Sequence, residues 1–238
     1  MKKKEKLQHD ANKLISKFLD LQNLVKQGDL QKGMSECKNI IKKEPLEPLP
    51  HNIHGIVLAR LGRIQEAESA FQQAVSLDSD YDEAWCNLGE LLLVLSKPEE
   101  AAQALLTAVR LEQNNLHYRY QLGRALAASG KKEQAISSFV NVIEQDSKFV
   151  EAYIRISEIF RERGNLGESI KLQKNAIDIA PNRWDLRLDL ARQFSEMGLR
   201  SAALEQLDEV RKLEPNSFDG YYLAAKLYRD ANMDQEAL

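Results

Sequence analysis

The chain has 238 residues, which is longer than a single hydrophobic core usually requires, so two domains or a repeat array are the opening possibilities. Apolar residues make up 43% and charged residues 29%, as in ordinary soluble, folded proteins, whereas only 7% are aromatic. The net charge of -3 gives no general attraction for nucleic acid or for an anionic membrane surface, so we expect neither as a partner.

Residues 1–13 are predicted to be a basic tail or a helix extension that is solvated. In the stretch that follows, Lys17, Asp20 and Gln22 interrupt the apolar residues, which favours an amphipathic helix over a signal peptide. No segment approaches the roughly 18 apolar residues that a bilayer span needs. Cys37 and Cys86 are too few for a disulfide framework or a metal cluster, so we expect free thiols and a cytoplasmic location.

A 34-residue period runs through the chain without an insertion, which is typical of a repeat architecture. Columns at this spacing hold glycine, alanine or large apolar residues: Gly55, Gly89, Gly123; Ala67, Ala101, Ala135; and Leu24, Leu58, Leu92, Leu126, Phe160, Phe194, Tyr228. A further column holds Gly28, Gly62, Ser96, Gly130, Gly164 and Gly198. The predicted repeats are 14–47, 48–81, 82–115, 116–149, 150–183 and 184–217, with a truncated seventh repeat at 218–238.

The repeat 82–115 shows why each unit should form two helices. Trp85, Leu88, Gly89 and Leu92 are spaced as one face of a first helix. Gly89 costs about 1 kcal/mol of helix propensity relative to alanine, so we expect a close approach of two helices there. The second glycine column falls just past the first helix, where a left-handed residue can end it. Pro98 then suits the first position of the second helix.

Two other junctions carry local signals. Asn165 followed by Glu168 predicts a capping-box start for the second helix of its repeat. Pro45, Pro181 and Pro215 share one column at the end of the unit, where proline is expected to stop the second helix.

These columns, with Trp85-x-x-Leu88-Gly89 as the best example, resemble the tetratricopeptide repeat from about residue 14 to the end. The repeat 14–47 is degenerate, since Leu21 and Ile40 stand where small residues are expected, so we predict that it caps the array. The resemblance implies an all-α fold, a right-handed superhelical solenoid of antiparallel helix pairs whose first helices line a concave groove. It implies little about function, because many unrelated pathways use this scaffold.

A candidate peptide-binding groove follows from the side of the first helices that faces away from the core, where residues four apart project together. Its predicted residues are Asn52, Ile56, Cys86, Asn87, Glu90, Tyr120, Gln121, Arg124, Arg155 and Glu158. We expect an extended or helical peptide along repeats two to five, with Tyr120 as its anchor. The alternative is that these residues form only a solvated face.

The sequence predicts no catalytic residue, no cofactor and no metal. The motifs G-x-S-x-G, G-x-G-x-x-G and H-E-x-x-H are absent. His51 and His54 share a helix face, but His54 falls in a core column and has no acidic or cysteine partner nearby in the sequence. Cys86 would act as a nucleophile only beside a positioned histidine, and an inert thiol is the expectation.

The leading interpretation is a non-catalytic protein–protein interaction module, a scaffold or adaptor that binds a peptide or partner protein in its groove. The alternative is the N-terminal, substrate-recruiting arm of a longer enzyme of the glycosyltransferase, sulfotransferase or methyltransferase type. That alternative rests on the last residues, 235–238, which stop one turn into a second helix, whereas natural solenoids usually end in a polar cap. An uncapped end also makes self-association possible.

Overall fold

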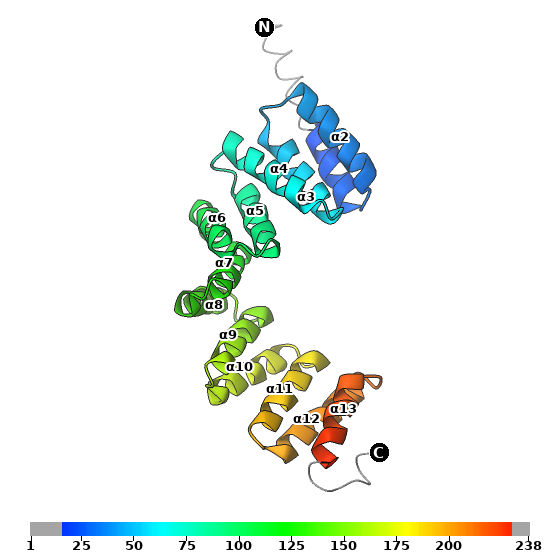
Figure 1. Cartoon of the computed structure of the whole chain (residues 1–238), viewed down its shortest axis with the longest axis vertical. Coiled ribbons are helices and arrows are strands. Elements are labelled where there is room, and N and C mark those ends of the chain that lie inside the picture. The colour runs from blue at the N-terminus through cyan, green and yellow to red at the C-terminus, as the bar shows by residue number, and fades with distance from the viewer. Residues whose placement is uncertain (1–15, 230–238) are drawn as a thin grey trace. The chain divides into compact units, whose positions relative to one another are not determined.

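A computed structural model describes residues 16–229, and within this range α-helix is the only regular secondary structure. The predicted all-α fold is therefore confirmed (Figure 1). The chain divides into two compact units, residues 1–131 (unit 1) and residues 132–238 (unit 2). The predicted basic tail at 1–13 and the chain end at 235–238 lie outside the described residues.

Unit 1 consists of stacked antiparallel helices. Its helices are a first one over residues 16–26, then α2 (Leu30–Lys43), α3 (Pro48–Arg60), α4 (Ile64–Leu77), α5 (Asp82–Val94), α6 (Pro98–Leu111) and α7 (Leu116–Ala128). From α2 onward each helix packs against the next one in the chain, and α5 also contacts both α3 and α7. The first helices of successive repeats are therefore neighbours.

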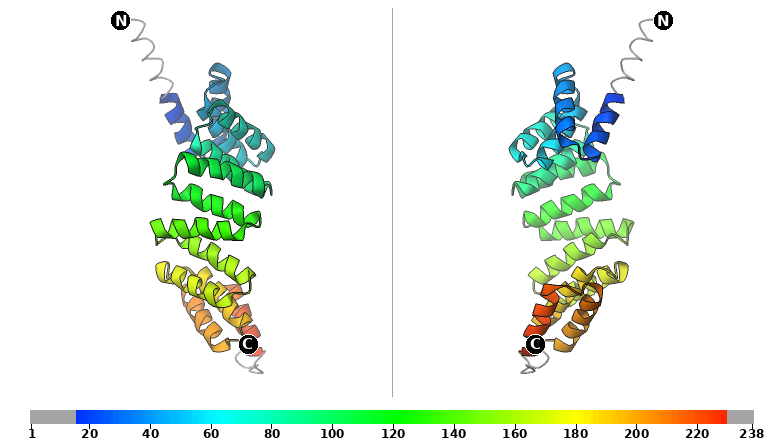
Figure 2. Two further views of the ribbon diagram at one scale, coloured as in Figure 1. Left: turned by 90° about the vertical axis from the view of Figure 1, so that its left-hand side faces the viewer. Right: turned by 90° about the vertical axis from the view of Figure 1, so that its right-hand side faces the viewer.

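Unit 2 repeats this organisation (Figure 2). Its helices are α8 (Lys132–Gln145), α9 (Val150–Glu162), α10 (Leu166–Ile179), α11 (Trp184–Glu196), α12 (Arg200–Leu213) and α13 (Phe218–Arg229). Consecutive helices pack together, and α11 also contacts α13. Within residues 16–229, no helix combines the length and the apolar character that crossing a membrane requires.

The predicted left-handed residues end the first helices. At the end of α3, Gly62 has φ +75°, its N–H donates to the Ala59 carbonyl, and the Arg63 N–H donates to the Leu58 carbonyl. This pair of bonds is the Schellman motif, which satisfies carbonyls that the helix end leaves open. Ser96 adopts the same conformation with φ +57°, although it carries a β-carbon.

The expected close approach of helices at glycine is confirmed. A β-carbon at Gly89 of α5 would lie 2.5 Å from Cγ of Leu105 on α6. At the equivalent place in the preceding repeat, a β-carbon at Gly55 would lie 2.6 Å from the ring of Phe71. The absence of a side chain on the first helix therefore makes room for a large side chain on the second.

The predicted proline positions are confirmed, whereas the predicted capping box is wrong. Pro98 is the first residue of α6, and Pro45, Pro181 and Pro215 each lie two residues beyond the end of a second helix. Asn165 is the N-cap of α10, but its side chain makes no capping hydrogen bond. The Asn165 backbone N–H closes α9 by donating to the Phe160 carbonyl.

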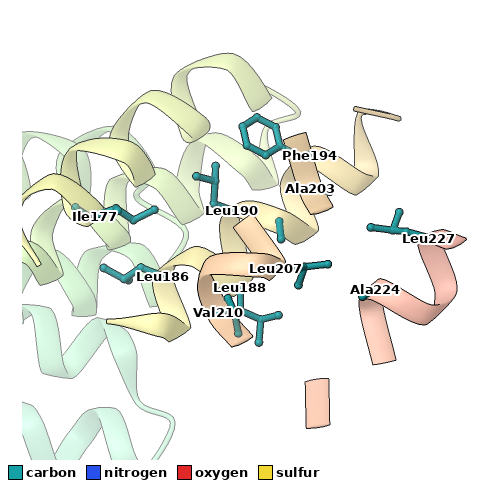
Figure 3. Close-up of a cluster of buried hydrophobic side chains, with 12 residues drawn as sticks. Ile177, Leu186, Leu188, Leu190, Phe194, Ala203, Leu207, Val210, Ala224 and Leu227 are labelled. Atoms are coloured by element: carbon teal, nitrogen blue, oxygen red, sulfur yellow. The ribbon is translucent and has the colours of Figure 1, made fainter. Parts of the chain in front are cut away.

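The core of unit 2 lies where α10, α11, α12 and α13 meet (Figure 3). Leu186, Leu190 and Phe194 of α11 belong to one buried cluster with Ile177 of α10 and Leu207 of α12, and Leu186 lies on the side of Ile177. Each of these side chains is less than a tenth exposed. Burial of such residues at about 25 cal/mol per Å² of apolar area is the main source of stability for a helical repeat.

Polar side chains are also buried in unit 2. Ser157 of α9 stands where earlier repeats have the helix glycine, and its hydroxyl donates to the Ser169 carbonyl over 2.9 Å. The Ser169 hydroxyl, fully buried, donates to Oε1 of Gln193 on α11 over 2.9 Å. The network joins three helices, and it satisfies groups that would otherwise be costly to bury.

Candidate functional site

The predicted groove residues of repeats two to four lie on α3, α5 and α7, the neighbouring first helices of unit 1. We call the surface that these residues share the first-helix face. It comprises Asn52, Ile56, Cys86, Asn87, Glu90, Tyr120, Gln121 and Arg124. Three of them, Asn52, Cys86 and Gln121, are less than a tenth exposed. These three side chains lie between adjacent helices, so a partner can contact little of them directly and they act by holding their exposed neighbours in place.

Asn52 connects α3 to α5. Its Nδ2 donates to the Tyr81 hydroxyl over 3.0 Å, and its Oδ1 accepts from Nδ2 of Asn87 over 2.9 Å. Asn52 is fully buried, whereas Asn87 is only half-buried. Burial holds the pKa of Tyr81 above its usual range, so this hydroxyl stays protonated. The network fixes the orientation of Asn87 and leaves part of its amide exposed on the face.

A pocket of about 230 Å³ opens beside Asn87. Its apolar walls include Ile56 from α3 and Val94 from α5, and the Val94 side chain is 70% exposed. Its polar rim includes Asn87, Glu90 and Arg60. An exposed branched side chain next to fixed polar groups is the usual composition of a small recognition pocket.

Cys86, Glu90 and His117 meet between α5 and α7. Cys86 Sγ lies 3.8 Å from Oε1 of Glu90, and the same oxygen lies 2.8 Å from Nε2 of His117. The hydrogen bond with Glu90 raises the pKa of His117, although partial burial opposes it. Burial, followed by the charge of Glu90, holds the pKa of the Cys86 thiol far above its usual range. The predicted pairing of Cys86 with Glu90 on one helix face is therefore confirmed.

The α7 residues of the face are anchored to their surroundings. Tyr118, next to the predicted anchor Tyr120, donates its hydroxyl to Oδ2 of Asp82 on α5 over 2.9 Å. Arg124 donates to Oε1 of Gln121 over 2.8 Å. Tyr120 and Arg124 are both half-buried, so each offers part of its side chain at the surface.

The remaining predicted groove residues, Arg155 and Glu158, belong to α9 in unit 2. Arg155 Nη1 and Glu158 Oε2 form an ion pair at 2.8 Å. On α11, Arg192 likewise pairs with Asp189 at 3.0 Å. Both pairs are two-fifths exposed, so each contributes little to stability. The first helices of unit 2, α9 and α11, thus present alternating charges.

Two relationships escaped the sequence reasoning. The Asn52–Asn87 hydrogen bond joins residues 35 apart, and the contact between Glu90 and His117 joins residues 27 apart. Neither separation equals the 34-residue period, so aligning equivalent positions does not bring these partners together. The usable signal was that first helices are neighbours, so a residue can contact positions offset from its own equivalent, by one residue for Asn87 and by seven residues for His117.

The stacked helix pairs define a helical repeat protein. Residues 54–115, 120–183 and 160–227 match models described as tetratricopeptide repeat, and the first two segments alone cover more than half of the chain. The chain therefore belongs to the tetratricopeptide repeat family, as its resemblance predicted. A comparison with curated proteins gave no match.

Solved structures show the same fold at low sequence identity. A tetratricopeptide repeat protein from Parabacteroides merdae is 22% identical, with a TM-score of 0.72 over 93% of this chain and 90% of that one. PilF of Pseudomonas aeruginosa is 16% identical, with a TM-score of 0.72 over 89% and 96%. YrrB, described as a TPR protein with an unusual peptide-binding site, is 19% identical, with a TM-score of 0.61 over 78% and 96%.

Proposed function

We propose that this chain is a non-catalytic interaction module that binds a peptide segment of a partner protein on the first-helix face of unit 1. The observation that carries the proposal is the pocket beside Asn87. Its apolar walls, Ile56 and Val94, stand next to a side-chain amide whose orientation the buried Asn52 fixes. Preorganised polar groups around an apolar pocket reduce the entropy that binding costs.

The size of the pocket favours a peptide side chain over a small-molecule ligand. Sites for drug-sized ligands and cofactors enclose about 300–1,000 Å³. The volume here is about 230 Å³, which suits a single apolar side chain. Covering Val94, which is 70% exposed, would remove apolar area from water, while the amide of Asn87 is placed to bind a backbone carbonyl or N–H.

The state of the Cys86 thiol supports a role without catalysis. Reactive cysteines have a depressed pKa, because the thiolate is the nucleophile. Burial and the neighbouring Glu90 shift the pKa of Cys86 in the opposite direction. A nucleophilic cysteine needs a general base, usually a histidine, beside its sulfur. Here the His117 imidazole is instead hydrogen-bonded to Glu90 at 2.8 Å.

The same proposal places the module, as an adaptor, in a reducing compartment such as the cytoplasm. Cys37 and Cys86 are both buried free thiols, and small secreted domains more often pair their cysteines. Among proteins of the same fold, YrrB is described as having a peptide-binding site, which shows that the scaffold can present one.

Selection from a random peptide display library, with the full 238-residue chain as bait, tests the proposal. We expect enriched peptides with a shared apolar anchor, and we expect Val94→Asp to weaken their binding at least tenfold. Val140→Asp is the control, because Val140 is also exposed but belongs to α8 of unit 2 and not to α3, α5 or α7. Equal binding by the Val94→Asp variant and the wild type would refute the assignment of this face.

A further inference from the structure

Three potential metal ligands of different chemistry meet on the first-helix face. They are the thiol of Cys86, a carboxylate oxygen of Glu90 and the imidazole of His117, and their ligand atoms all lie within 4.8 Å of one another. Glu90 Oε1 is central, 3.8 Å from the sulfur and 2.8 Å from the imidazole nitrogen. Two of the ligands come from one turn of α5, and the third comes from α7, which packs against α5.

Two of these separations bracket the ligand spacing of a tetrahedral zinc ion. Zinc bonds of about 2.0–2.3 Å at tetrahedral angles put neighbouring ligand atoms about 3.3–3.6 Å apart. The two observed distances, 3.8 Å and 2.8 Å, lie on either side of that range. The Glu90 and His117 side chains, which set both distances, are 37% and 57% exposed.

The charges around the cluster favour a cation. Three carboxylates, Glu90, Glu83 and Asp82, carry negative charge close to the Cys86 sulfur. Arg124 carries positive charge close to His117. A divalent ion would compensate the charge of these carboxylates.

We propose that Cys86, Glu90 and His117 bind a zinc ion. A sulfur, a nitrogen and a single carboxylate oxygen suit zinc, whereas calcium and magnesium require shells made of oxygen. Three protein ligands leave the fourth position to water or to a donor from a bound ligand. The inference does not depend on the peptide-binding proposal, because the three ligands all belong to the chain itself.

Cobalt(II) serves as the spectroscopic probe. The full chain, reduced and freed of metal with a chelator, is titrated with cobalt(II). We expect one equivalent to produce a sulfur-to-cobalt charge-transfer band and the intense visible bands of a tetrahedral site, and we expect zinc to remove both. Cys86→Ser should abolish the charge-transfer band. Cys37→Ser is the matched control, since it removes the other buried thiol and should leave the spectrum unchanged.

Two further variants keep the inference testable if Cys86→Ser fails to fold, which far-ultraviolet circular dichroism would reveal. Glu90→Gln and His117→Gln each remove one ligand at a partly exposed position, and each should weaken zinc affinity at least tenfold. His51→Gln, on α3, should leave the affinity unchanged. The proposal is overturned by a wild type without the charge-transfer band, or by Glu90→Gln and His117→Gln variants that bind zinc as tightly as the wild type.

Discussion

Leu105 on α6 fills the space that a β-carbon at Gly89 on α5 would need, since that carbon would lie 2.5 Å from Leu105 Cγ. Phe71 stands in the same relation to Gly55 in the preceding repeat. This contact explains why a residue that weakens a helix by about 1 kcal/mol stands there in consecutive repeats. The packing of a large side chain across two helices outweighs the lost propensity.

Gly89→Ala should lower the free energy of unfolding by about 1 kcal/mol net. Overpacking lowers the stability by about 1–3 kcal/mol, whereas the higher helix propensity of alanine raises it by about 1 kcal/mol. The clash involves the branch point of Leu105, which cannot move away without displacing the whole side chain. Urea unfolding followed by circular dichroism measures the change.

Gly167→Ala is the control for that variant, because a β-carbon at Gly167 in α10 meets nothing within 4 Å. This substitution should stabilise the chain by about 0.4–1 kcal/mol through the unfolded state. The two glycine-to-alanine changes therefore have opposite expected signs. Equal changes in the free energy of unfolding for both variants would show that packing against Leu105 does not determine the effect of Gly89→Ala.

Ser96→Gly should raise the free energy of unfolding by about 0.5 kcal/mol. Ser96 has φ +57°, a conformation that costs a residue with a β-carbon about 1–2 kcal/mol. Glycine avoids this cost, but its greater freedom in the unfolded chain offsets part of the gain in stability. Gly130→Ala is the reciprocal test, because Gly130 has φ +77° and alanine there should destabilise. A stabilised Gly130→Ala variant would contradict this interpretation of the turn.

Much of the fold was predictable because its determinants are local and recur every 34 residues. Helix faces, the left-handed turn at Gly62 and the prolines each require only a few neighbouring residues, so the sequence pattern carries them. The division at residue 131 was not predictable, since the repeat register runs through it unchanged. The capping box at Asn165 failed, whereas Asp29 caps α2, although the backbone N–H of each residue closes the preceding helix in the same way.

The site was predictable only in part. The helical period correctly placed Cys86 and Glu90 together on one face. It could not show that Asn52 is fully buried, because burial there depends on how close α5 lies to α3. Contacts between unlike positions of neighbouring repeats, such as Glu90 with His117, depend on the sideways offset of the helices, which the sequence does not encode locally.

Ser169→Ala should destabilise unit 2 by about 1–3 kcal/mol. The substitution leaves Oε1 of Gln193 buried without the donor that Ser169 provides, and an unsatisfied buried acceptor costs about that much. Ser137→Ala is the control, because Ser137 is exposed and bonds only its own helix, so its effect should stay within about 0.5 kcal/mol. Indistinguishable urea midpoints for the two variants would argue against the buried network.

His54 and His117 should titrate on opposite sides of 6.5. Burial is the largest cause that lowers the pKa of His54, whereas the hydrogen bond to Glu90 raises that of His117. The stability that His54 contributes is therefore lost as the pH falls from 6.5 through its folded pKa. The stability from His117 is present below 6.5 and is lost as the pH rises through its folded pKa.

Imidazole proton NMR in the presence of a chelator checks this order, with His54→Gln and His117→Gln used to assign the signals. Glu90→Gln should return the pKa of His117 toward 6.5, because it removes the charge of the hydrogen-bonded partner. A His117 pKa that does not respond to Glu90→Gln would mean that the contact is absent in solution.

Tyr120→Ala combined with Arg124→Glu should weaken binding of the selected peptides at least tenfold while leaving the fold intact. Both side chains are half-buried on α7, and aromatic and arginine residues carry much of the energy at interfaces. Tyr222→Ala with Lys226→Glu is the matched control, since these residues occupy the same repeat columns on α13. If both double variants lose binding equally, the peptide does not discriminate between the two helices and the first-helix face of unit 1 is not its specific site. If only the α7 variant loses binding, the specificity lies in the side chains around Tyr120, because the scaffold around the two pairs is the same repeat.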